Sequence, residues 1–196
     1  MGLSKAFECC SAPLFQIQVY IFKGFMKIYT RTGDKGSTQI YADKAVRVDK
    51  DDLVVKSYGD MDELNSQIGL LAAHVATKHQ PMLHDIQRNL FQAGFAISAS
   101  STLAQDDIEN LEKLIDNITG QMPPNTSFVL PGGCKSAAQA HVCRAVCRRA
   151  ERSVISLSKH YDVPEVVHAY LNRLSDFLFT FARFLNIEAG VDEVAV

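Results

Sequence analysis

Three arginines recur at every fourth residue in the segment "HVCRAVCRRAERSV": Arg144, Arg148 and Arg152. On an α-helix, residues four apart lie on one face, with Cβ atoms only about 5–6 Å apart. Three like charges in a row repel one another; Glu151 offsets part of this repulsion, and Arg149 points to a different side. Guanidinium groups form paired hydrogen bonds with phosphate oxygens. The spacing therefore predicts a site for an elongated polyanion such as a triphosphate, with a solvated charged face as the alternative.

The segment "TRTGDKGST", residues 30–38, combines two glycines with charged and hydroxyl side chains. Gly33 and Gly36 allow backbone N–H groups to converge on an anion, and Lys35 adds a positive charge. Three hydroxyl groups are suited to phosphate or to the ligand shell of Mg²⁺, those of Thr30, Ser37 and Thr38. The order of residues differs from the GxxxxGK[ST] phosphate loop, so the segment alone is more typical of a plain turn. Together with the arginine row, it indicates a second contact to a nucleotide.

The composition is that of one globular domain. A chain of 196 residues with 47% hydrophobic and 21% charged residues can bury a core of its own. The formal net charge of −2 gives no basic surface overall, so we expect no nucleic-acid partner. The apolar stretch at residues 14–25 is too short and too polar to span a bilayer, so we expect no membrane association.

The cysteines indicate a reducing compartment. Their number is odd and they form no CxxC pair, which predicts a cytoplasmic protein without a disulfide framework; they are Cys9, Cys10, Cys134, Cys143 and Cys147. Cys143 and Cys147 stand four apart and could clasp a metal, but small thiols in a helix are usually buried. We therefore interpret both as core residues.

The elements that must position these residues are helical. Apolar residues recur with the period of an α-helix in five segments, and no long strand pattern is present; the segments are residues 60–79, 82–98, 106–119, 135–160 and 165–188. Asp62 and Glu63 are expected in the first turn of the first helix, where the helix dipole favours anions. Short extended pieces are expected at residues 27–29 and 39–41. The predicted fold is an all-α bundle of five helices with a structured N-terminal loop.

The expected domain organisation follows from these limits. Residues 1–25 are an extension without an assigned function, residues 26–190 form the helical domain, and residues 191–196 are a C-terminal tail.

In the last helix, Asn172, Asp176 and Arg183 line a stripe beside an apolar seam. Polar groups beside a buried seam need hydrogen-bond partners, so Asn172 is equally suited to a structural role and to ligand contact.

Five motifs give the chain a family resemblance: "KIYTRTGDKGST", "SYGDMDELNSQIG", "FVLPGG", "HVCRAVCRRAERSV" and "YLNRLSDFLFTFAR". In order and spacing the chain resembles the PduO-type cob(I)alamin adenosyltransferases from residue 27 to about residue 186. The resemblance implies a five-helix bundle of the ferritin-like type, and a homotrimer that binds ATP and a corrinoid between neighbouring subunits. The implied reaction converts ATP and cob(I)alamin to adenosylcobalamin and triphosphate.

The resemblance also implies roles for individual residues. The loop around ATP would comprise Thr30, Arg31, Thr32, Gly33, Ser37 and Thr38, with Lys50 as a further lysine near the phosphates. The ATP-binding segment of the fourth helix would comprise Arg148, Arg149, Ala150, Glu151 and Arg152, and Asn172 would join it from the last helix. Asp62 and Arg144 would form a salt bridge across the subunit interface. Phe128 would lie under the corrin ring and displace its lower ligand.

The implied chemistry needs no nucleophile from the protein, because cob(I)alamin itself attacks the 5′ carbon of ATP. The protein would position the substrates and stabilise charge on the departing triphosphate through Arg148, Arg152, Lys35 and Mg²⁺. Phe128 would favour four-coordinate Co(II), which accepts an electron more readily. A reductase and a cobalamin-dependent enzyme are conceivable protein partners.

Two other classes share parts of this pattern. Ferritin-like di-iron proteins use two ExxH motifs, whereas this chain offers one, at residues 165–168. A cobalamin carrier would bind both ligands without reaction. The sequence leaves delivery of the product to a client enzyme open as a second role.

Overall fold

The computed structural model describes residues 29–40, 46–124 and 127–196. The chain divides into two units, Met1–Arg31 and Thr32–Val196, which are described separately. In the first unit, the Arg31 guanidinium lies 5.6 Å from the centre of the Tyr29 ring, a cation–π contact, and Arg31 has a φ of 59°. The predicted extension at residues 1–25 lies outside the described residues.

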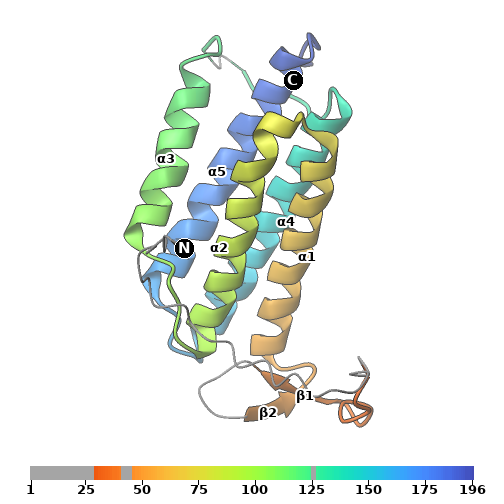
Figure 1. The fold of residues 1–196 in the computed structure, drawn as a ribbon, viewed down its shortest axis with the longest axis vertical. Coiled ribbons are helices and arrows are strands. Elements are labelled where there is room, and N and C mark those ends of the chain that lie inside the picture. The colour runs from red at the N-terminus through yellow and green to blue at the C-terminus, as the bar shows by residue number, and fades with distance from the viewer. Residues whose placement is uncertain (1–28, 41–45, 125–126) are drawn as a thin grey trace, which may run out of the picture. The chain divides into compact units, whose positions relative to one another are not determined.

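Five α-helices form the second unit and pack side by side (Figure 1). They are α1 (Leu53–His74), α2 (Gln80–Ser98), α3 (Gln105–Thr119), α4 (Lys135–Leu157) and α5 (Glu165–Glu188), with a 3₁₀ turn at Thr77–His79. α4 packs against α1 and α5, while α2 covers α1 and α3 covers α5. The predicted all-α bundle of five helices is confirmed.

The core takes in buried residues from all five helices, including the faces that α4 and α5 turn toward each other. The α5 seam predicted from periodicity is buried, with Leu174, Leu178 and Phe181 fully enclosed. Cys143 and Cys147 of α4 are also fully buried, as predicted, and burial raises the pKa of the Cys143 thiol to about 12. These thiols occupy the inner face of α4, whereas Arg148, Arg149 and Arg152, which follow them in sequence, are exposed.

The predicted start of the first helix is wrong. α1 begins at Leu53, where the Asp52 carboxylate accepts a hydrogen bond of 2.8 Å from the Val54 N–H and so caps the helix. Asp62 and Glu63 consequently lie in the middle of α1 and not in its first turn. The helix also ends at His74, before the 3₁₀ turn. The other four helices lie close to their predicted ranges, and α5 matches its range in full.

Ahead of α1 lies a short antiparallel hairpin of β1 (Ser37–Ile40) and β2 (Val46–Asp49). Its register pairs Ser37 with Asp49 and Ile40 with Val46. An extended piece was expected near β1, but β2 was not predicted, although "VRVD" alternates in polarity. The hairpin brings the end of the glycine loop next to the residues that precede α1.

The C-terminal end of α5 carries a pH-sensitive contact. Glu188 lies 2.6 Å from Lys78 Nζ and 3.0 Å from His79 Nε2. The hydrogen bond from Lys78 is the main cause that lowers the pKa of Glu188; burial opposes it, and His79 adds to it. The folded protein therefore binds fewer protons here than the unfolded chain. The contact thus stabilises the folded state above the ordinary carboxyl pKa, and this stabilisation is lost as the pH falls through the lowered pKa.

We expect the free energy of unfolding to fall more steeply for the wild type than for Glu188→Gln between about pH 5 and pH 3. Denaturant unfolding at a series of pH values measures both slopes. Equal slopes would show that the contact with Lys78 and His79 adds nothing to folding stability.

No helix within the described ranges has both the length and the apolar character needed to cross a bilayer.

Candidate active site

The arginine row predicted from spacing lies on α4. Arg148 and Arg152 are exposed, whereas the Ala150 methyl group between them is fully buried in the core. At 100° per residue, Arg149 lies on the side of the row that faces α1, and Glu151 on the side that faces α5. Arg148 and Arg152 thus lie on the outer edge of the helix, flanked by the two neighbouring helices, whereas Arg144, the third member of the row, is half-buried.

The residues on either side of the row, Arg149 and Glu151, contact side chains of the neighbouring helices. Arg149 pairs with Glu63 of α1, and its Nε lies 3.4 Å from Asp60 Oδ1. On the opposite side, Asn172 of α5 donates a hydrogen bond of 3.2 Å to Glu151 Oε1. Arg149, Glu151 and Asn172, all predicted from sequence as site residues, are thereby held in place around the row.

Arg148 and Arg152 themselves have no acidic partner among the described residues. Two cations about 6 Å apart in water repel by only about 0.7 kcal/mol, so a solvated pair is tolerated. The same pair attracts any anion that spans both groups, more strongly as water is excluded. The row is therefore available to an external polyanion.

A small polar cavity of about 190 Å³ adjoins the row between α1 and α4. It is lined by Lys56, Asp60, Arg149, Arg152, Ser153 and Ser156. Ser153 donates a hydrogen bond to Asp60, and the three cations outnumber the one carboxylate. The positive field of the row thus extends toward the start of α1. Sequence reading missed Lys56 because no pattern links it to a helix almost a hundred residues later.

Asp62 and Arg144, the pair that the resemblance implies, form no ion pair with each other among the described residues of this chain. Asp62 is exposed on α1, and Arg144 is half-buried on α4, with its Nε lacking a hydrogen-bond partner in the described part of the chain. His141, one turn earlier, is buried, and both of its ring nitrogens lack partners there too. Burial lowers the pKa of His141, Arg144 lowers it further, and Glu193 raises it.

The glycine loop folds back on the hairpin. Gly36, with a φ of 85°, donates a hydrogen bond of 3.2 Å to the Gly33 carbonyl and accepts one of 2.8 Å from the Lys50 N–H. The Lys50 side chain lies against Gly33, because a Cβ added there would stand 3.4 Å from Lys50 Nζ. Lys50 therefore lies next to the loop, and Lys35 is exposed. The role near the phosphates that the resemblance implies for Lys50 stays a prediction.

Arg47 of β2 holds the loop, a role that sequence reading missed. Its guanidinium donates hydrogen bonds of 2.7 Å to the Thr32 carbonyl and 2.7 Å to Ser37 Oγ. The alternation of "VRVD" would have pointed to this residue, had a strand been predicted there. Thr30 and Arg31 belong to the first unit.

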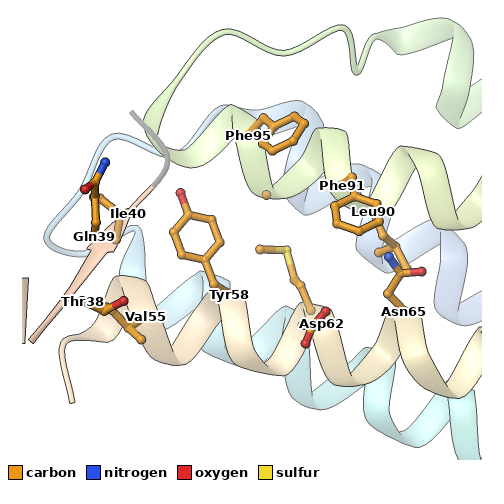
Figure 2. A pocket seen from close by; sticks show the side chains of 12 residues that line it. Thr38, Gln39, Ile40, Val55, Tyr58, Asp62, Asn65, Leu90, Phe91 and Phe95 are labelled. Atoms are coloured by element: carbon orange, nitrogen blue, oxygen red, sulfur yellow. The ribbon is translucent and has the colours of Figure 1, made fainter. Parts of the chain in front are cut away.

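An apolar pocket of about 320 Å³ opens between β1, α1 and α2 (Figure 2). Figure 2 shows the rings of Tyr58, Phe91 and Phe95 among its lining, together with the polar side chains of Thr38 and Asp62. Tyr58 forms a hydrogen bond with Ser98, which fixes the ring across the pocket. Phe91 and Phe95 stand one helical turn apart on α2, and Phe91 is 57% exposed.

Phe128 is 88% exposed and lies in the segment that leads to α4. Arg148 follows Lys135, the first residue of α4, by thirteen positions, which places it about 20 Å along the helix axis at 1.5 Å per residue. Phe128 and the exposed arginines Arg148 and Arg152 are therefore well separated along the chain's fold.

Within the described ranges, no three His, Cys, Asp or Glu side chains gather at distances that would hold a metal ion. The single ExxH sequence, residues 165–168, lies at the start of α5.

Comparison with known proteins assigns the chain to a family. The family model described as cobalamin adenosyltransferase matches residues 28–185. The corrinoid adenosyltransferase of Bacillus subtilis (strain 168) is 41% identical over 181 residues, which cover 86% of this chain and 91% of the relative. The corrinoid adenosyltransferase of Homo sapiens is 39% identical over 181 residues, which cover 85% of this chain and 72% of the relative.

A solved structure supports the same family assignment. A variant of the PduO-type ATP:corrinoid adenosyltransferase from Lactobacillus reuteri, complexed with cobalamin and ATP, superposes with a TM-score of 0.80 at 33% identity. The match covers 87% of this chain and 99% of that one. The resemblance inferred from the five motifs is thereby confirmed. The chain belongs to the cobalamin adenosyltransferase family.

Proposed function

We propose that this protein transfers the 5′-deoxyadenosyl group of ATP to the cobalt of cob(I)alamin. The Co(I) electron pair forms a bond to C5′ of the ribose while the C5′–O bond breaks. The triphosphate departs with that bonding pair, and cobalt becomes Co(III) in adenosylcobalamin. Family membership and the binding of cobalamin and ATP by the Lactobacillus reuteri enzyme support this assignment.

The observation that carries the proposal is the unpaired state of Arg148 and Arg152 among the described residues. Negative charge grows on the triphosphate as the C5′–O bond lengthens, and fixed guanidinium groups stabilise it without reorganisation. Arg149, Glu151 and Asn172 would lie on either side of the contact between the two arginines and the triphosphate. The loop with Lys35, Lys50 and Thr38 would hold the remaining oxygens, and its hydroxyls suit Mg²⁺ bound mainly through phosphate.

The apolar pocket beside Asp62 is suited to the corrinoid. Its walls of Tyr58, Met61, Phe91 and Phe95 would exclude water from the reduced cobalt, which protonates or oxidises in water. The pocket is large enough for only part of the macrocycle. The corrinoid would therefore extend beyond this protomer.

A trimer with sites between subunits would complete the active site, and we include it in the proposal. Arg144 has a buried Nε without a partner in the described residues, and Asp62 is exposed, so each could satisfy the other across an interface. Such an arrangement would bring the arginine row of one subunit toward the apolar pocket of the next. The free thiols of Cys134, Cys143 and Cys147 fit the reducing cytoplasm, where a reductase would supply the electron.

The test is a spectroscopic assay with ATP, Mg²⁺ and chemically reduced corrinoid. We expect the spectrum of Co(I) to be replaced by that of the alkylated Co(III) product, with one triphosphate released per adenosyl group transferred. Binding of both ligands without triphosphate release would instead identify a carrier. Stoichiometric iron in the purified protein would favour a di-iron oxidase.

A further inference from the structure

Phe128 lies in residues 128–134, the segment that leads to α4. The C-terminal end of this segment is anchored by α5. Asn186, which is buried, accepts a hydrogen bond of 2.9 Å from the Cys134 N–H and donates one of 3.1 Å to the Gly132 carbonyl. Gly133 has a φ of 101°, and a Cβ there would overlap the Asn186 side chain. The "PGG" turn is thus fixed to the last turn of α5 before α4 begins.

The N-terminal end of the same segment is held by residues 194–196. Leu130 N–H donates a hydrogen bond of 2.8 Å to the Val194 carbonyl, and Val196 N–H donates one of 2.9 Å to the Phe128 carbonyl. These bonds flank an antiparallel bridge between Val129 and Ala195. The side chains of Val194 and Val196 are 62% and 84% exposed, so the backbone makes the contact.

Residues 194–196 are in turn fixed through Glu193. Its carboxylate lies 2.9 Å from Arg183 Nε, and the two side chains are only 14% and 10% exposed. Breaking a buried ion pair by removing one partner is strongly unfavourable, so this pair fastens the chain after α5. Gly190, with a φ of 64°, makes the turn that directs the chain back along the helix end.

We propose that residues 193–196 are positioning residues that hold Phe128 in its exposed place. An apolar ring with 88% of its surface in solvent has little packing of its own to fix it, so its placement depends on the backbone bonds at Phe128 and Leu130. This inference rests on the proposed role of Phe128 at the lower face of the corrinoid. It adds the segment after α5 to the residues on which that role depends.

The experiment compares the full chain with a variant that lacks residues 194–196. The deletion removes both backbone hydrogen bonds but keeps the Arg183–Glu193 pair. The matched control, Val194→Ala with Val196→Ala, keeps the backbone bonds and removes only exposed side chains. Hydrogen exchange at the Leu130 amide is expected to become roughly tenfold faster in the deletion variant and to stay unchanged in the control.

Activity is measured from Co(II) corrinoid with a reductant and from prereduced Co(I). We expect the deletion to slow the Co(II) assay roughly three- to tenfold, as for the loss of one or two hydrogen bonds, and to leave the Co(I) assay unchanged. In the Phe128→Ala background, the deletion should add no further loss.

Unchanged exchange at Leu130, or equal losses in both assays, would overturn the inference. If Phe128→Ala itself shows no selective loss with Co(II), the proposed role of Phe128 fails. The exchange measurement still decides separately whether residues 194–196 hold the segment.

Discussion

Arg148→Ala is expected to lower turnover by about a hundredfold to a thousandfold while the protein stays folded. The side chain is exposed and has no acidic partner in the described residues, so its removal should cost little stability. In the proposed reaction it stabilises charge that develops on the triphosphate. Removing one such donor typically costs about 2.7–4 kcal/mol of transition-state stabilisation.

The measurement is steady-state turnover with prereduced cob(I)alamin, which isolates the alkylation step from reduction. Arg88→Ala is the matched control, because Arg88 is an exposed arginine on α2 that pairs with Asp85 far from the row. Arg148→Lys should recover only part of the loss, since an ammonium group cannot make the paired hydrogen bonds of a guanidinium. A near-normal rate for Arg148→Ala would contradict the phosphate role.

Phe128→Ala is expected to separate the two halves of the reaction. With Co(II) corrinoid and a reductant, the rate should fall about tenfold or more, which is 1.4 kcal/mol or more of barrier. With prereduced cob(I)alamin it should remain near normal. The physical reason is that the apolar ring excludes water and the benzimidazole nitrogen from the lower face, and the resulting four-coordinate Co(II) accepts an electron more readily.

The spectrum of bound Co(II) gives an independent reading, because loss of the ring should reduce the four-coordinate fraction. Phe128→Leu keeps an apolar side chain and should retain part of that fraction. Equal losses of rate for Phe128→Ala in the Co(II) and Co(I) assays would contradict the proposal that Phe128 acts by excluding the lower axial ligand. Thermal stability is expected to change little, because the ring is mostly exposed.

Helix periodicity predicted the elements that carry the site, because α4 and α5 bury long, regular apolar faces. The start of α1 was missed, since it depends on a cap at Asp52 and not on a periodic pattern. β2 is four residues long and largely exposed, so little in its composition distinguishes it from a loop.

The arginine row was also predictable, because spacing on one helix fixes which side chains share a face. Which arginines are free was not, since that depends on Glu63, which is 86 positions from Arg149. The roles of Arg47 and Asn186 depend in the same way on contacts between distant segments. Sequence resemblance named Phe128, but only the fold shows how the chain after α5 holds its backbone.

The most direct test of the central claim is a crystal structure of this protein with ATP and Mg²⁺ bound. The account predicts triphosphate oxygens within hydrogen-bond distance of the guanidinium groups of Arg148 and Arg152, with the ribose C5′ directed toward an apolar pocket. A nucleotide bound elsewhere, with both arginines turned to bulk solvent, would contradict it.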